Sequence, residues 1–264
     1  MTDVRRPLAL VTGASSGIGA DLARELARDG HDLVLSARRV EPMAALASEL
    51  GGHGAGATVV AADLARPGAA AALADELAGR GLAIDVLINN AGLGANGRFA
   101  DSDPVRDAEM LQVNVVALTE LTRRLLPPMI ARRRGRVMLV ASTAAFQPGP
   151  QMAVYCATKA YVLSFGEAIA YELRGTGVTV TTVCPGATAT NFSAVAGTES
   201  TGLHHNPLIP VMTSAEVARG AYRALKAGRR VATLGLVNKL VAASGRLSPR
   251  RLSLPIANSM MARR

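Results

Sequence analysis

Tyr155 and Lys159 offer the clearest acid–base chemistry in the chain. They are four positions apart in an apolar run of helical pattern, and residues at that spacing share one helix face. An ammonium beside a phenol favours the phenolate, and so lowers the tyrosine pKa from about 10 towards the range in which an acid/base catalyst works. The spacing predicts that Tyr155 is a proton donor. The alternative for an isolated pair of this kind is an ordinary surface pair on a helix.

A glycine-rich turn near the start of the chain is typical of a phosphate-binding loop. The apolar run 8–12 predicts a buried strand, and apolar residues recur at helical spacing from residue 18 to 26. Glycines between a strand and a helix let backbone N–H groups and the helix N-terminus approach a pyrophosphate. The residues predicted to contact the phosphates are Gly13, Ser15, Ser16, Gly17, Ile18 and Gly19.

The end of the second predicted strand indicates which cofactor ribose is accepted. An NAD-binding protein carries an acidic residue at this place, whereas this chain has Ala37 followed by Arg38 and Arg39. A guanidinium group suits a 2′-phosphate, so the sequence predicts NADP(H) in preference to NAD(H). The alternative is that the two arginines begin a solvated helix.

Apolar strands and helical segments alternate through the remaining chain. The further predicted strands are 33–37, 58–62, 84–88, 137–141, 178–184 and 231–234. This alternation predicts an α/β fold with βαβ units, that is, a Rossmann-type doubly wound parallel sheet of about seven strands flanked by helices. Ligands bind such a sheet at the carboxyl ends of its strands.

Six segments together resemble the motif series of the short-chain dehydrogenases/reductases, in order from residue 8 to about 191. They are 12–19 (TGASSGIG), 89–92 (NNAG), Asn114, Ser142, Tyr155 with Lys159, and Pro185-Gly186 with Thr190. Two positions depart from the family pattern, since Cys156 stands where serine is common and Cys184 where asparagine is common. Neither departure removes a functional group.

The resemblance implies catalytic roles for four residues. Ser142 would hydrogen-bond the substrate carbonyl oxygen while Tyr155 protonates it, and the two would form an oxyanion site. Lys159 would hold the nicotinamide ribose and lower the tyrosine pKa, and Asn114 would order a water that feeds protons to Lys159. In the reverse reaction Tyr155 would be the base.

The resemblance also implies cofactor contacts beyond the glycine loop. They are Asp63 with Leu64 at the adenine, Asn90, Ala91 and Gly92 at its ribose, and Pro185, Gly186, Thr188 and Thr190 at the carboxamide. Asp63 and Thr190 could instead be helix N-caps, and Asn90 a turn residue.

The substrate side is predicted to be apolar. The expected contacts are Phe146, Met152 and Phe192 beside Ser142 and Tyr155, and residues 192–212 are expected to form a lid loop. An apolar pocket fits a hydrophobic ketone, aldehyde or secondary alcohol. The expected activity is that of an NADPH-dependent carbonyl reductase or alcohol dehydrogenase. The alternative is an NADP(H)-binding redox sensor without turnover.

Composition favours a single NADP(H)-binding oxidoreductase domain over residues 1–264, in the cytoplasm. With 264 residues and 49% hydrophobic content, an ample core is expected. No apolar run is long enough for a membrane helix, and the two cysteines lack metal-ligand spacing, so no metal site is predicted. The helices 104–126 and 155–173 are apolar over wide faces, and the family resemblance implies that such helices pair to form a homodimer or homotetramer.

The basic charge is concentrated in the last part of the chain. The net charge is +9, whereas residues 217–264 alone carry +11 and no acidic residue. A nucleic-acid partner is therefore not predicted for the domain as a whole. Residues 236–264 form a basic, amphipathic C-terminal extension. It either folds back over the substrate pocket or a neighbouring subunit, or it contacts an anionic membrane surface.

Overall fold

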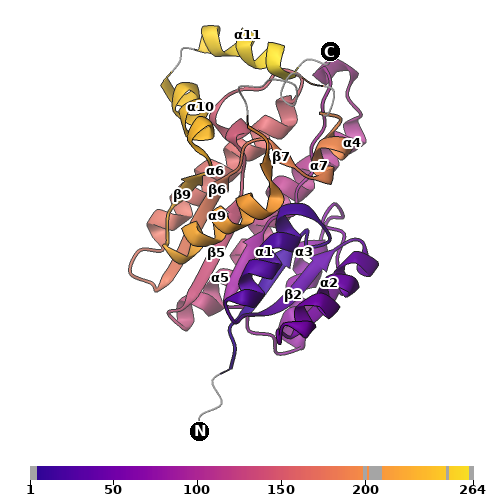
Figure 1. Ribbon diagram of the computed structural model, residues 1–264, viewed down its shortest axis with the longest axis vertical. Coiled ribbons are helices and arrows are strands. Elements are labelled where there is room, and N and C mark those ends of the chain that lie inside the picture. The colour runs from indigo at the N-terminus through magenta and orange to yellow at the C-terminus, as the bar shows by residue number, and fades with distance from the viewer. Residues whose placement is uncertain (1–4, 199–200, 202–209, 248–249, 262–264) are drawn as a thin grey trace.

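The computed structural model describes residues 5–198, 201, 210–247 and 250–261. Within them, seven parallel strands form a sheet in the order β3-β2-β1-β4-β5-β6-β9 (Figure 1). The strands are β1 Leu8–Thr12, β2 Asp32–Ala37, β3 Ala57–Ala61, β4 Val86–Asn89, β5 Gly135–Val140, β6 Val178–Cys184 and β9 Val231–Thr233. The predicted Rossmann-type fold is confirmed, with strand ends within two residues of those expected.

Helices cover both faces of the sheet. One face carries α1 Gly17–Arg28, α2 Val40–Gly52 and α9 Ser214–Lys226. The other carries α3 Ala69–Gly79, α5 Leu118–Ala131 and α6 Ala153–Glu172. The other α-helices among the described residues follow the carboxyl ends of strands or lie near the C-terminus: α4 Pro104–Leu111, α7 Asn191–Ala196, α10 Leu236–Leu247 and α11 Arg250–Met261.

The apolar runs of the strands build two cores. In β1, Leu8 and Leu10 belong to the core under α3, α5 and α6, whereas Ala9 and Val11 belong to the core under α1, α2 and α9. Successive side chains of a strand point to opposite faces. A strand covered on both faces therefore needs apolar residues facing both ways, which is why residues 8–11 do not alternate with polar residues.

The order in which successive strands are added to the sheet reverses at β1. This strand pairs with β2 on one side and with β4 on the other. In an open parallel sheet such a reversal leaves a crevice at the carboxyl ends of the two central strands. The ends of β1 and β4 carry the glycine loop and the 89–92 segment, which are therefore brought together.

Two segments differ from the predicted elements. The helix expected over 104–126 is divided into α4, a π-helical turn Gln112–Ala117 and α5. Such turns occur frequently at functional sites, and this one contains Asn114. The expected lid loop begins instead as helix α7, because Thr190 caps its N-terminus and Gly197, with a φ of 67°, ends it. The lid residues 199–200 and 202–209 lie outside the described residues.

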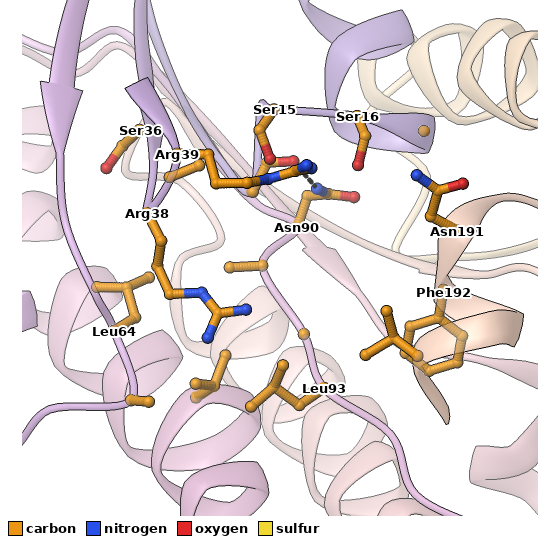
Figure 2. Close-up of a pocket in the computed structure, with 18 of the residues that line it drawn as sticks. Ser15, Ser16, Ser36, Arg38, Arg39, Leu64, Asn90, Leu93, Asn191 and Phe192 are labelled. Atoms are coloured by element: carbon orange, nitrogen blue, oxygen red, sulfur yellow. Dashed lines mark hydrogen bonds between the residues drawn. The ribbon is translucent and has the colours of Figure 1, made fainter. Parts of the chain in front are cut away.

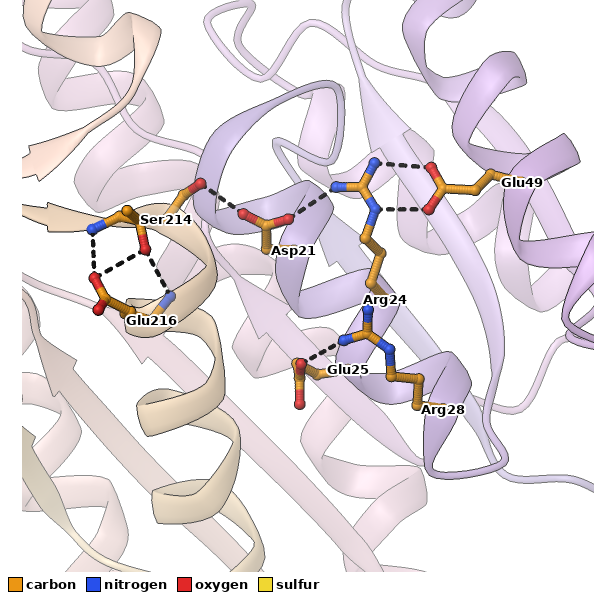
Figure 3. A network of polar contacts seen from close by, with 8 residues as sticks. Asp21, Arg24, Glu25, Arg28, Glu49, Ser214 and Glu216 are labelled. Carbon is orange, nitrogen blue, oxygen red and sulfur yellow. Dashed lines mark hydrogen bonds and ion pairs between the residues drawn. The ribbon is translucent and has the colours of Figure 1, made fainter.

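A polar network ties the first helix to distant parts of the chain (Figure 3). Arg24 forms two hydrogen bonds of 2.8 Å with Glu49 of α2 and a third with Asp21. The hydroxyl of Ser214, at the start of α9, donates to Asp21 at 2.6 Å. These contacts fix α1, whose N-terminus carries the glycine loop, between its two neighbours.

Three further observations concern chemistry away from the sheet. In the described part of the chain, no helix is both long and apolar enough to cross a membrane. The same residues contain no group of three or more potential metal ligands. Cys156 and Cys184 are buried, and neither forms a disulfide bond with a described residue.

Candidate active site

A pocket of about 440 Å³ lies at the carboxyl ends of β1 to β4 (Figure 2). The residues predicted to bind the cofactor that line it are Gly13, Ser15, Ser16, Gly17, Ile18, Arg38, Arg39, Asp63, Leu64, Asn90, Ala91, Gly92 and Thr190. Gly19 is buried under the loop. The fold thus brings together residues from five separate segments of the chain.

The glycine loop is packed too closely for side chains. A Cβ on Gly19 would clash with the carbonyl oxygen of Gly13, and one on Gly13 would lie 2.9 Å from Cα of Ala91. The Asn90 side chain donates to the carbonyl oxygens of Thr12 and Gly13 at 3.0 and 3.2 Å. Asn90 therefore holds the loop itself, and the exposed backbone N–H groups remain for a phosphate.

Two arginines and a hydroxyl group give the pocket an anion-binding end. Figure 2 shows Arg38 and Arg39 extending into the pocket from the end of β2. Neither forms an ion pair with any described residue. The Ser36 hydroxyl lines the same end and is buried without a hydrogen-bond partner. Together with the glycine cradle, these groups fit a dinucleotide that carries an additional phosphate.

Tyr155, Ser142 and Lys159 meet beside the carboxyl end of β5. Tyr155 and Lys159 lie on one face of α6, and the Lys159 ammonium is 5.8 Å from the centre of the tyrosine ring. Both side chains are buried. The Ser142 hydroxyl hydrogen-bonds Tyr155 and accepts a hydrogen bond from Ala144 N at 3.1 Å. Lys159 Nζ donates to the carbonyl oxygen of Val140 at 2.8 Å.

Burial dominates the electrostatics of this group. It raises the pKa of Tyr155 to about 12, while the hydrogen bond with Ser142 acts in the opposite direction. Burial also lowers the pKa of Lys159 to about 8. The predicted lowering of the tyrosine pKa by Lys159 is therefore not found in this structure. The ammonium is directed to Val140, and removing the phenol from water has the larger effect.

The Asn114 side chain fastens the 89–94 loop to α6. Its Oδ1 accepts from Leu93 N at 2.9 Å, and its Nδ2 donates to Leu93 O and to Thr158 Oγ1 at 2.9 and 3.0 Å. Both amide hydrogens are used in this way. A Cβ on Gly92 would lie 3.4 Å from both Asn114 Oδ1 and Lys159 Nζ, so the two polar atoms flank one glycine.

Phe192 separates the cofactor pocket from Tyr155. The two rings are 5.5 Å apart between centroids at an interplanar angle of 46°, and the Phe192 ring lies where a side chain on Gly94 would be. Thr190 positions this ring by capping α7, since its hydroxyl accepts from Phe192 N at 3.3 Å. The N-cap role considered for Thr190 is confirmed, and Thr190 also lines the pocket.

The remaining predicted residues lie around the substrate side. Met152 is buried at the start of α6, and Phe146 ends a 3-10 turn, Thr143–Phe146, after Ser142. Pro185, Gly186 and Thr188 do not line the cofactor pocket. The Pro185 carbonyl accepts from Thr143 N at 2.8 Å, and Thr188 donates to Gly186 O at 3.0 Å.

The C-terminal helices pack beside this substrate side. A Cβ on Gly245 of α10 would lie 2.9 Å from the carbonyl oxygen of Phe146. Asn96 Nδ2 donates to Met261 O of α11 at 3.0 Å, and Gln151 Nε2 donates to Asn258 at 3.4 Å. The described part of the basic extension thus folds back onto the protein near the active-site loops.

Sequence reasoning missed several pocket residues. Those that it did not propose for the cofactor are Ser36, Ala37, Ala62, Ala65, Leu93, Val113, Asn191 and Val195, with Gly94 and Phe192 from the substrate side. Ser36 and Ala62 could have been found from their places at strand ends. Asn191 and Val195 follow Thr190 on α7, which was predicted as a loop, so their common helix face was not visible in the sequence.

Comparisons with known proteins agree with this geometry. Residues 7–200 match the family described as short chain dehydrogenase. The chain is 33% identical to the ketoacyl reductase HetN of Nostoc sp. strain PCC 7120, over 94% of this chain and 88% of that protein.

Two solved structures are similar over nearly the whole chain. A short-chain dehydrogenase from Sphingobium yanoikuyae in complex with NADPH is 34% identical, with a TM-score of 0.81 over 90% of this chain and 92% of that one. The bulky-bulky ketone specific alcohol dehydrogenase from Comamonas testosteroni is 32% identical, with a TM-score of 0.76 over 90% and 91%. The chain therefore belongs to the short-chain dehydrogenase/reductase family of nicotinamide-dependent oxidoreductases.

Proposed function

We propose that this oxidoreductase is an NADPH-dependent carbonyl reductase that acts on a hydrophobic ketone or aldehyde, and on the secondary alcohol in reverse. The observation that carries the proposal is the group formed by buried Tyr155 and Lys159 with Ser142, which lies beside a pocket with an arginine-lined end. The NADPH complex of the Sphingobium relative supports the choice of cofactor.

Tyr155 and Ser142 would act on the carbonyl oxygen. Bound NADPH supplies the hydride that reaches the carbonyl carbon. Ser142 donates a hydrogen bond to the oxygen, and Tyr155 transfers its proton there as negative charge develops. The raised pKa of about 12 keeps Tyr155 protonated at neutral pH, so the resting site holds the proton that reduction requires.

Lys159 and Asn114 would support the proton donor. The Lys159 ammonium would hydrogen-bond the nicotinamide ribose and stabilise the phenolate that remains after proton transfer. Asn114 would hold a water near Lys159 that returns the proton to the site. Its side chain already fixes Leu93 and Thr158, which supports a positioning role as well.

Most of the remaining cofactor contacts line the pocket, whereas Pro185, Gly186 and Thr188 are proposed from the family resemblance alone. Arg38 and Arg39 would bind the 2′-phosphate, and Asp63 with Leu64 would contact the adenine. Asn90, Ala91 and Gly92 would line its ribose, while Pro185, Gly186, Thr188 and Thr190 would face the carboxamide. Ser36 adds a hydroxyl donor at the phosphate end.

The substrate would be apolar and would enter past Phe192. The aromatic contact with Tyr155 and the neighbouring Phe146 and Met152 support a hydrophobic partner. The name of the Comamonas relative, which is specific for bulky ketones, supports the same class. We propose residues 192–212 as the lid of a single domain, with Phe192 moving aside when substrate binds.

A substrate panel tests this proposal. Ketones, aldehydes and secondary alcohols of increasing size are assayed by absorbance with NADPH, NADP⁺, NADH and NAD⁺. We expect turnover of apolar ketones with NADPH and little with short polar ones. Absence of turnover across the panel, together with normal NADPH binding, would overturn the proposal.

Cofactor preference should change when the phosphate-binding end is altered. In the Ala37→Asp, Arg38→Leu variant, a carboxylate is added at position 37 and the guanidinium at position 38 is lost. The carboxylate can accept a hydrogen bond from the 2′-hydroxyl of NADH and repels the 2′-phosphate of NADPH. We expect the kcat/KM ratio of NADPH to NADH to fall by about a hundredfold, from two effects of about 1.4 kcal/mol each. An Arg98→Leu variant, which also loses an exposed arginine, is the control. A wild-type enzyme that prefers NADH would contradict this assignment.

The enzyme should be a homodimer or homotetramer in the cytoplasm. Val116 and Tyr161, beside α5 and on α6, are 47% and 38% exposed and line one groove, and an apolar surface of this kind suits a second copy of the chain. The chain has only two cysteines, and neither is in a disulfide bond with a described residue, which supports a reducing compartment.

Light scattering at micromolar concentration tests the assembly. We expect a mass of two or four times 27.2 kDa, and a shift towards monomer in Val116→Glu, because a buried unpaired carboxylate disfavours the interface. A wild-type protein that is entirely monomeric would contradict it.

A further inference from the structure

Helix α10 exposes two of its leucines. Leu236 is 74% exposed and Leu240 is 64% exposed, and their spacing places them on one face of the helix. The face towards the protein carries Asn238 and Ala242, which are both buried. A surface helix usually turns its leucines to the core, so the arrangement in α10 is reversed.

The orientation of α10 is fixed by specific contacts. Asn238 Nδ2 donates to Leu234 O at 2.7 Å, and its side chain fills the space where a Cβ on Gly186 would be. Gly245 lies directly on the backbone of Phe146. Small and polar residues thus allow the helix to lie close to the protein, and the leucines are left outside.

The charged residues of the segment that carries these leucines all have one sign. Residues 217–264 carry +11 and no carboxylate side chain. Lys239 is exposed on the leucine face of α10, and on α11 Arg251 and Leu254 are exposed three residues apart. Exposed leucines among basic residues are typical of helices that lie in a membrane interface. Figure 1 shows α10 and α11 at the same end of the molecule.

We infer that the outer leucine face, made of Leu236, Lys239, Leu240, Arg251 and Leu254, docks on an anionic lipid surface. The basic side chains attract anionic headgroups, and the leucines enter the boundary between headgroups and acyl chains. A second copy of this face is a poor partner, because two surfaces of the same charge repel each other. A nucleic acid would leave the leucines in water.

Vesicle sedimentation with the full-length chain tests this surface. We expect binding to vesicles of phosphatidylglycerol and phosphatidylcholine at low salt, and none to phosphatidylcholine alone. Binding should be lost near 1 M salt, where the screening length is about 3 Å. Leu236→Ser with Leu240→Ser should weaken binding at least about tenfold, because two leucines no longer enter the lipid.

Two variants with the same change of charge distinguish binding through this face from a general effect of the protein's positive charge. Lys239→Glu should weaken binding about tenfold, whereas Arg28→Glu, which makes the same charge change on α1, should have little effect. Absence of binding to anionic vesicles at low salt overturns the inference. Equal losses of vesicle binding in the two charge variants would also overturn it, as would unchanged binding in the double leucine variant.

The inference does not depend on turnover. Reduction of a water-soluble ketone by NADPH, measured in the same variants without vesicles, should equal that of the wild type. Failure of vesicle binding with intact turnover rejects only the lipid surface. Vesicle binding without turnover of any carbonyl rejects only the proposed reductase function.

Discussion

Replacing Tyr155 with phenylalanine is expected to lower kcat by about a thousandfold or more, the range that a general acid contributes. The affinity for NADPH should be almost unchanged, because the variant loses the transferable proton and keeps the ring that contacts Phe192. Steady-state kinetics with an accepted ketone and a binding titration with NADPH measure the two effects separately.

A second tyrosine provides the control for this variant. Tyr171 is 61% exposed, and its ring lies against the guanidinium of Arg174. Tyr171→Phe should leave kcat unchanged within about twofold, in the range of surface substitutions. A Tyr155→Phe enzyme that keeps more than about a tenth of the wild-type rate would reject Tyr155 as the proton donor.

Replacing Lys159 with methionine should abolish activity and stabilise the fold at neutral pH. The lysine pKa is lowered from 10.5 to about 8 by burial, so the folded state disfavours the ammonium at pH 7. The shift corresponds to about 3 kcal/mol, part of which is offset by the hydrogen bond to Val140 that methionine cannot make. We expect the free energy of unfolding to rise by about 2 kcal/mol at pH 7.

The stabilisation expected for Lys159→Met depends on pH in a direction that follows from the lysine pKa. A lowered folded-state pKa means that the unfolded chain binds more protons between pH 8 and 10.5, so wild-type stability rises across that window. The stabilisation by Lys159→Met should therefore be largest below pH 8 and vanish near pH 10.5, as measured by urea unfolding. Lys226→Met, which breaks an exposed ion pair with Asp29, should lose at most about 1 kcal/mol. A Lys159→Met protein that is less stable than wild type at pH 7 would contradict the assigned burial effect.

The sheet could be predicted from the sequence because its strands are buried on both faces. The run 8–11 is apolar throughout, and 178–184 consists of valine, the β-branched threonine and one cysteine. The segments 8–12 and 178–184 are followed by glycine and proline respectively, so even their boundaries agree with β1 and β6. The π-helical turn at Asn114 was not predictable in this way. It depends on side-chain bonds to Leu93 and Thr158, which are far away in the sequence.

The sequence predicts which residues form the candidate site and at which strand ends they lie, but it does not predict their pKa values. Glycine, arginine and tyrosine positions follow from motifs in register, and the fold gathers most of them at one edge of the sheet. The raised pKa of Tyr155 could not be foreseen, because it depends on burial by α6 and Phe192 rather than on the spacing to Lys159. For the same reason, the reversed orientation of α10 is not visible in its periodicity, which only predicts an amphipathic helix.

Transfer of a deuterium label tests the proposed chemistry most directly. The enzyme is incubated with an apolar ketone and NADPH that carries deuterium at the transferable position of its nicotinamide ring, and the product alcohol is examined by mass spectrometry. We predict one deuterium on the former carbonyl carbon with the wild-type enzyme, and product formation reduced about a thousandfold or more in Tyr155→Phe. If no alcohol forms from any ketone or aldehyde while NADPH binds normally, or if the alcohol forms without the label, the account of this protein as a carbonyl reductase is wrong.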